Sequence, residues 1–292
     1  MIAQVFNALF RAALVAVLVA LPALVLPSAS HDGSQIVVLV SIVIALLVFL
    51  EYNSAYPSLV EFRYAPPINR LRFGALFLSV AVLSAVCADA TSNSTIGAIG
   101  AAVARLTGGW LDVPFSPVRL MVLTLPPDAP ATLVNTLRDA AGFAYFVSLA
   151  IVVVFFLQVH VAGWPARHGA FNVWINLPLF DPTAGSDVVR RLQRHGLINL
   201  VLGFLLPFLF PAGVKAASGV IDPMILANAQ TLIWVVSLWA ILPASMMIRG
   251  LAMNRIAQMI LQKRQRAYAA AEAEGDDTPA AEESKSRTYQ LV

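Results

Sequence analysis

Histidines are the side chains in this 292-residue chain that are best suited to hold a metal or a haem. They are His31, His160, His168 and His195. A haem inside a helical bundle takes axial ligands, usually histidines, at membrane depth, and none of the four lies in the middle of an apolar run. His160 and His195 lie at the edges of two such runs, and with Asp181 and Asp187 nearby they would make a metal site. Because histidines at membrane edges more often cap helix ends, we predict no metal and no cofactor.

The other reactive residue types form no catalytic pattern. The single cysteine, Cys87, cannot form an internal disulfide and excludes a cysteine-rich zinc or iron–sulfur site. The chain contains no G-x-S-x-G elbow, P-loop, H-E-x-x-H or G-x-G-x-x-G motif. Paired acids occur at 276–277 and 282–283, in a polar stretch typical of a solvated tail. The sequence therefore gives no support for an enzyme.

Prolines lie within the apolar runs, and their positions leave open a role in transport. Pro207 and Pro211 are four residues apart in one run, and Pro243 lies in another. Each removes a helical hydrogen bond and can kink its helix, but prolines are frequent in membrane helices. The plainer interpretation is structural. The alternative is a kinked helix that lines a cavity, as in a small transporter or channel for an apolar or neutral ligand.

The composition indicates which elements position these residues. The chain is 59% hydrophobic and 12% charged, with a mean hydropathy of +0.78. Soluble domains are about 45–50% apolar and about 25% charged, so this chain has too little charge to cover a soluble globule. The composition excludes a soluble enzyme, a disordered chain and a disulfide scaffold, and it indicates a polytopic membrane protein.

Apolar runs free of acidic and basic residues mark the membrane crossings. A helix needs about 20 such residues to cross a bilayer, and these runs are too long for barrel strands of about 9–11 residues. We therefore predict an all-α fold, a transmembrane helical bundle with six spans. The spans lie near 8–27, 35–54, 72–90, 140–161, 196–215 and 229–250.

The first span has an alternative interpretation as a signal peptide. The apolar stretch that contains it ends in Ser28-Ala29-Ser30, which resembles a small-residue cleavage site. Its one positive charge, Arg11, follows an already apolar start, whereas a signal peptide begins with its charge. This order favours a retained helix, and either outcome leaves the other spans unchanged.

The basic residues orient the bundle. With both termini in the cytoplasm, 15 of the 19 Lys and Arg residues fall on the inner side and 4 on the outer side. This asymmetry follows the positive-inside rule and predicts a multi-pass protein of a bacterial-type inner membrane. The pI of about 9.2 then reflects membrane orientation, and we predict no nucleic-acid partner.

The outer segment 91–139 is too apolar for a free loop. Its first part has a helical face formed by Ile96, Ile99, Val103 and Leu106. Gly108-Gly109 is expected to stop this helix, and Ser116-Pro117 resembles an N-cap followed by proline at the first helical position. We expect short helices that lie on the outer leaflet or cover the bundle. A re-entrant half-helix at 97–104, as in some transporters, is the alternative.

Two inner loops, 51–72 and 162–195, carry aromatic and basic residues that suit docking to anionic lipid headgroups or to another protein. In the second loop, Ser186 can cap a short basic amphipathic helix, with Gly196 beyond its end. The plainer interpretation is that these side chains only fix helix depth. The candidate docking residues are Arg63, Tyr64, Arg70, Arg72, Trp164, Trp174, Arg190, Arg191 and Arg194.

The C-terminal part divides the chain into a membrane domain, 1–267, and a disordered cytoplasmic tail, 268–292. Basic and apolar residues at helical spacing follow Arg249, so the sixth helix is expected to continue along the membrane surface. The absence of reactive groups in the spans, combined with structured inner loops, favours a non-enzymatic accessory, scaffold or assembly component of a larger membrane complex. Its expected partners are membrane lipids, including anionic headgroups, and other membrane-protein subunits.

Overall fold

The computed structural model describes residues 2–26, 31–56, 58–89, 95–165, 172–180, 187–220 and 222–276. These residues form helices and connecting turns with no strand among them, which confirms the predicted all-α fold. Six of the described helices are long and apolar enough to cross a membrane, and each corresponds to one predicted span, with four spans ending one or two residues beyond the helix. They are α1 (Ile2–Val25), α2 (His31–Asn53), α3 (Ile68–Asp89), α6 (Ala131–His160), α8 (Val188–Ala216) and α9 (Ala229–Asp276).

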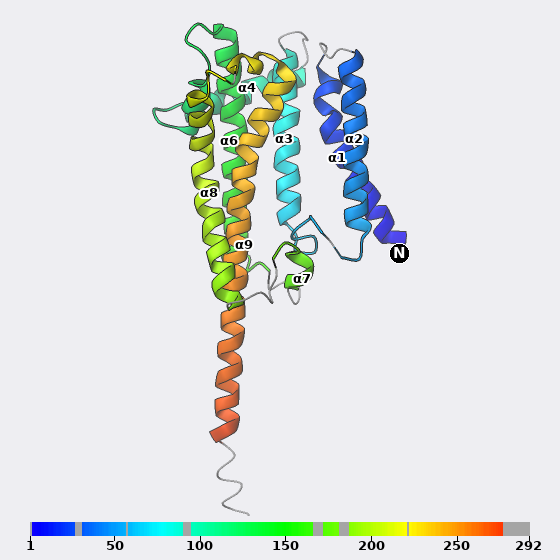
Figure 1. The fold of residues 1–292 in the computed structure, drawn as a ribbon, viewed down its shortest axis with the longest axis vertical. Coiled ribbons are helices and arrows are strands. Elements are labelled where there is room, and N and C mark those ends of the chain that lie inside the picture. The colour runs from blue at the N-terminus through cyan, green and yellow to red at the C-terminus, as the bar shows by residue number, and fades with distance from the viewer. Residues whose placement is uncertain are drawn as a thin grey trace, which may run out of the picture.

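The helices form a main bundle and an attached hairpin (Figure 1). The core lies where α3, α6 and α9 meet, and includes the fully buried Leu83, Phe155 and Ile248. The antiparallel pair α1 and α2 packs at the side of α3. We call the end where α3 and α8 begin the basic end; it also carries the short helix α7 (Val173–Asn176).

Two further helices cover the opposite end: α4 (Thr95–Leu111) and α5 (Pro117–Val122). The predicted start of α5 is confirmed, because the hydroxyl of Ser116 accepts a hydrogen bond of 3.0 Å from the N–H of Arg119. A 3-10 turn, Pro223–Ala227, leads into α9 at this same end.

The predicted stop of α4 at Gly108 is wrong, because the helix continues to Leu111. Gly108 serves close packing: a Cβ added at Gly142 of α6 would lie 2.4 Å from the Cα of Gly108. The large residues Ile99, Val103 and Leu106 are exposed, with Ile99 at 62%. The small-residue face of α4 therefore contacts the bundle, and its large apolar side chains point outward.

The predicted separate helix in the second inner loop is also wrong. Residues 188–195 are the first turns of α8, which passes through Gly196 without a break. A Cβ at Gly196 would lie 2.4 Å from Oδ1 of Asn254 and 3.1 Å from the carbonyl oxygen of Gly250 in α9. This glycine is needed for the approach of two helices, so it does not end one.

Helix α9 extends far beyond the bundle. Its 48 residues span about 72 Å at about 1.5 Å per residue, against a hydrocarbon core of about 30 Å. The extension continues in line with the membrane-spanning part (Figure 1) and does not turn along the bundle's end. Residues 268–276, predicted to belong to a disordered tail, are helical because alanine is the strongest helix former; 277–292 lie outside the described residues.

Candidate functional site

The loop between α2 and α3 is organised by the carboxylate of Glu51. Its Oε1 accepts hydrogen bonds of 2.6–2.8 Å from the backbone N–H groups of residues 58–60, and its Oε2 accepts one from the Ser58 hydroxyl. The guanidinium of Arg63 donates to the carbonyl oxygens of Glu51 and Tyr52 at 2.7 and 2.8 Å. The end of α2 therefore holds the loop in one conformation.

The same loop is bonded to the segment before α8. The N–H groups of Phe62 and Tyr64 donate to the backbone and side-chain oxygens of Asn176, at 2.7 and 3.0 Å. Phe62 is buried with φ at 55°, a left-handed conformation that is uncommon for bulky residues. The indole N–H of Trp164 donates to the carbonyl oxygen of Pro66 at 2.9 Å. These contacts join two loops that are about a hundred residues apart in the chain.

A charged cluster forms where this loop meets α8 and α9. Arg249 donates two hydrogen bonds to Glu61, from Nε to Oε2 at 2.6 Å and from Nη2 to Oε1 at 2.7 Å. Its third nitrogen donates to Oδ1 of Asn199 at 3.3 Å. The side chains of Glu61 and Arg249 are only 9% and 24% exposed. A paired fork of this kind is among the strongest side-chain hydrogen bonds.

Arg72 supplies a second buried guanidinium beside this pair. It donates to the carbonyl oxygen of Ser245 at 2.9 Å and lies 5.9 Å from the ring centre of Phe62. It interacts electrostatically with both Glu61 and Arg249. One carboxylate therefore balances two guanidinium groups. The cluster fixes the loop, α3 and α9 relative to one another.

The polar groups of this cluster are bonded mainly to one another. Both carboxylate oxygens of Glu61 are occupied by Arg249, so Glu61 is not free to act as a base. The described residues contain no group of three His, Cys, Asp or Glu side chains that could hold a metal. His160 stacks on Phe156 of its own helix, and His195 lies edge-on to Phe180. One member of the metal site considered above, Asp181, lies outside the described residues, and so does His168.

The structure divides the predicted docking residues. Trp164 is 2% exposed, and the guanidinium of Arg72 donates to the carbonyl oxygen of Ser245, so both side chains point into the bundle. Residue type alone predicts a surface position for both, because tryptophan and arginine are common at membrane edges. Arg63 is half-buried, and Arg191 lies over the ring of Phe180. The exposed candidates are Tyr64, Arg70, Arg190 and Arg194. For Trp174, the described part of the structure gives the backbone alone.

The prolines of α8 are explained by a contact with α9. Because Pro211 has no N–H, the carbonyl oxygen of Pro207 loses its helical partner. The indole N–H of Trp239 donates to that oxygen at 3.1 Å, in a buried contact. The four-residue spacing of the prolines therefore creates an acceptor that α9 uses. The predicted interruption of the helical ladder thus serves the packing of two spans.

We expect Trp239→Phe to destabilise the bundle by about 1–3 kcal/mol, because it leaves the Pro207 carbonyl buried without a donor. The additional change Pro211→Ala restores an N–H at the position that normally bonds this oxygen. Trp239→Phe should therefore lower the free energy of unfolding by a smaller amount in the Pro211→Ala background. Denaturant titration of the four proteins of this double-mutant cycle measures the difference. Equal costs in both backgrounds would contradict the assignment of this hydrogen bond.

Two of the cavities that border the prolines lie along the contact between α8 and α9. One has a volume of about 340 Å³ and is lined by apolar side chains of α8 and α9, among them Phe210, Leu242 and Pro243. The other, of about 230 Å³, lies between α6, α8 and α9 and includes Tyr145, Ser148 and Pro207. Both are small, and the first offers no polar side chain to a ligand. They suit a small apolar molecule better than an ion.

The sequence interpretation missed the principal residues of the charged cluster. In the sequence, Glu61 is one charge in an inner loop, Arg249 is one charge at a span edge, and nothing distinguishes Asn199. A carboxylate in an apolar, proline-containing loop was the one available signal. Arg249, which pairs with it, is 188 positions away, and Asn199, which accepts from Arg249, is 50 positions from that arginine, so no local pattern could identify them.

Comparison of the chain with protein-family models, with curated proteins and with solved structures gave no match.

Proposed function

We propose that this chain is a non-enzymatic structural subunit of a larger membrane complex, acting as an accessory, scaffold or assembly component. Its site of action would be a bacterial-type inner membrane. The described loops at the basic end are fixed by hydrogen bonds and a buried ion pair, which is typical of a rigid support. The observation that carries the proposal is the projecting part of α9.

The projecting part of α9 has no partner within the described chain beyond its first turns. Every residue from 261 to 272 is exposed, and the segment carries Lys263, Arg264 and Arg266. Arg264 alone reaches back, donating to Asp187 at 2.7 Å, where both side chains remain nearly half exposed. This hydrogen bond lowers the pKa of Asp187. Because helices gain most of their stability from packing, a long helix without a packed face favours a partner chain.

Photo-crosslinking tests this proposal at the projecting helix. A photoreactive residue at Gln265 should give an adduct with one other membrane protein in a fixed ratio. The same residue at Leu209, an exposed position in the membrane-spanning part of α8, is the control for random contact. Deleting residues 261–292 should leave the thermal stability of the bundle unchanged and should abolish its complex with the protein that Gln265 crosslinks. A complex that survives the deletion, or equal adducts at both positions, would refute the role of α9.

The proposal places the basic end and both termini in the cytoplasm. Two single cysteines in a Cys87→Ser background test this orientation. Val220→Cys replaces a residue at the opposite end that is 92% exposed, and Gln265→Cys replaces a residue on the projecting helix. We expect a membrane-impermeant maleimide to label Val220→Cys in intact spheroplasts and Gln265→Cys only after lysis. The reverse pattern of labelling would show that the bundle is inverted in the membrane.

The second candidate function is transport of a small apolar or neutral molecule. The apolar cavity beside Pro243 is the observation that favours it. Filling it by Leu242→Trp should abolish uptake of such a molecule into proteoliposomes if the chain is a transporter. A structural subunit reconstituted alone should give no protein-dependent flux in either form.

A further inference from the structure

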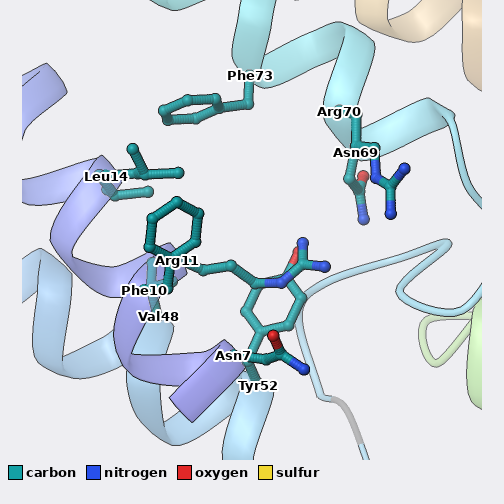
Figure 2. Close-up of a pocket in the computed structure, with 10 residues that line it drawn as sticks. Asn7, Phe10, Arg11, Leu14, Val48, Tyr52, Asn69, Arg70 and Phe73 are labelled. Atoms are coloured by element: carbon teal, nitrogen blue, oxygen red, sulfur yellow. The ribbon is translucent and has the colours of Figure 1, made fainter. Parts of the chain in front are cut away.

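A pocket between the α1–α2 hairpin and α3 has two kinds of lining. Its volume is about 430 Å³, and it lies near the basic end of the bundle. Figure 2 shows Phe10, Leu14 and Phe73 along one part of the wall, and the polar side chains along the other. The polar side chains are Asn7, Arg11, Tyr52, Asn69 and Arg70.

The pocket carries the positive charges of Arg11 and Arg70. No carboxylate pairs with Arg11 or Arg70 among the described residues. Glu51, next to Tyr52 in the chain, already accepts four hydrogen bonds within its own loop, and Glu61 is paired with Arg249. The guanidinium of Arg11 lies 4.6 Å from the ring centre of Tyr52, and that of Arg63 lies 5.8 Å from the same centre. The pocket is therefore a concave, positively charged site.

The depth of the pocket matches the edge of a bilayer. Tyr52 is in the last turn of α2, and Asn69 and Arg70 are in the first turn of α3. The apolar wall belongs to the membrane-spanning helices, and its neighbours on α1, such as Phe6 and Leu9, are exposed. A ligand with an anionic head and an apolar body would meet both linings at once.

We propose that this pocket binds one anionic phospholipid of the leaflet at the basic end, with its phosphate between Arg11 and Arg70 and an acyl chain against Phe10 and Phe73. Guanidinium groups bind phosphate oxygens through paired hydrogen bonds. Tyr52 and the two asparagines add neutral hydrogen-bonding groups, and the apolar wall selects a lipid over a free anion. This binding does not require membership of a complex, so it can fail or succeed independently of the proposed function.

Native mass spectrometry of the full chain in neutral detergent tests the proposal with three probes: phosphatidylglycerol, phosphatidylcholine and inorganic phosphate. We expect phosphatidylglycerol to bind at least about tenfold more tightly than phosphatidylcholine. The double variant Arg11→Gln/Arg70→Gln should lose this preference. The matched variant Lys263→Gln/Arg266→Gln removes two exposed charges from the projecting part of α9 and should keep it.

Each other result would overturn the proposal. Equal affinity for the two lipids would show that the pocket does not recognise the charge of the headgroup. An equal loss of the preference for phosphatidylglycerol in the two double variants would show unspecific electrostatic attraction. Inorganic phosphate that competes as strongly as phosphatidylglycerol would indicate a bare anion site. If the double variant does not fold, Arg70→Gln alone keeps the test valid, because Arg70 is exposed and should weaken lipid binding without loss of the circular-dichroism signal.

Discussion

Glu61→Ala is expected to be the most damaging single substitution at the basic end and to lower the free energy of unfolding by about 3–5 kcal/mol. It leaves Arg249 and Arg72 facing each other in a largely buried site, without the carboxylate that balances them. Arg249→Ala should cost less, because Arg72 can still compensate Glu61. Denaturant titration in detergent micelles measures both losses.

The exposed ion pair between Arg264 and Asp187 provides the control for this result. Both of its side chains are nearly half exposed, and such pairs contribute little to stability. Asp187→Asn should therefore change the free energy of unfolding very little. The double variant Glu61→Gln/Arg249→Gln should lose less than the sum of its two single changes. A Glu61→Ala protein as stable as the natural chain would show that the cluster does not hold the loop.

Gly142→Ala is the second substitution with a large expected effect. Its Cβ would lie 2.4 Å from the Cα and 2.6 Å from the backbone nitrogen of Gly108. Backbone atoms cannot rotate away, so α4 has to separate from α6. Overpacking of this kind costs about 1–3 kcal/mol, and we expect faster proteolysis of the segment that covers the end opposite the basic end.

The neighbouring glycines of α4 supply a matched pair for this test. A Cβ at Gly108 would lie 2.8 Å from the Cα of Asp139, whereas a Cβ at Gly109 meets nothing within 4 Å. Both changes to alanine bring the same gain in helix propensity, about 1 kcal/mol. Gly109→Ala should be neutral or stabilising, and Gly108→Ala destabilising. Equal effects of the two changes would contradict the close crossing of α4 and α6.

The six spans could be predicted because they depend on a property of the whole chain. A bilayer requires long apolar helices, and the runs without charge around residues 33–50 and 223–248 show them directly. Element ends depended on single residues and were less predictable. Gly108 and Gly196 have the residue type that usually ends a helix, yet both are positions where a second backbone comes close. Which role a glycine has is decided by the neighbouring helix, and that neighbour is distant in sequence.

The site was less predictable than the fold for the same reason. Arg70 is exposed, as expected for an arginine at the edge of a span. Arg72, two residues later, points into the bundle and is held by the carbonyl oxygen of Ser245. Whether the Arg72 side chain points into the bundle depends on the orientation of α3 relative to α9. Likewise, the partner that satisfies the Pro207 carbonyl, Trp239, is fixed by tertiary packing alone.

The most direct test of the proposed structural role is the mass of the species extracted from its membrane with a lipid-retaining polymer. The chain alone has a mass of 31.3 kDa. A subunit or assembly component predicts a larger particle that contains this chain and a different membrane protein in a fixed ratio, and that falls apart when residues 261–292 are deleted. A particle that contains only one copy of this chain and lipid would contradict the role.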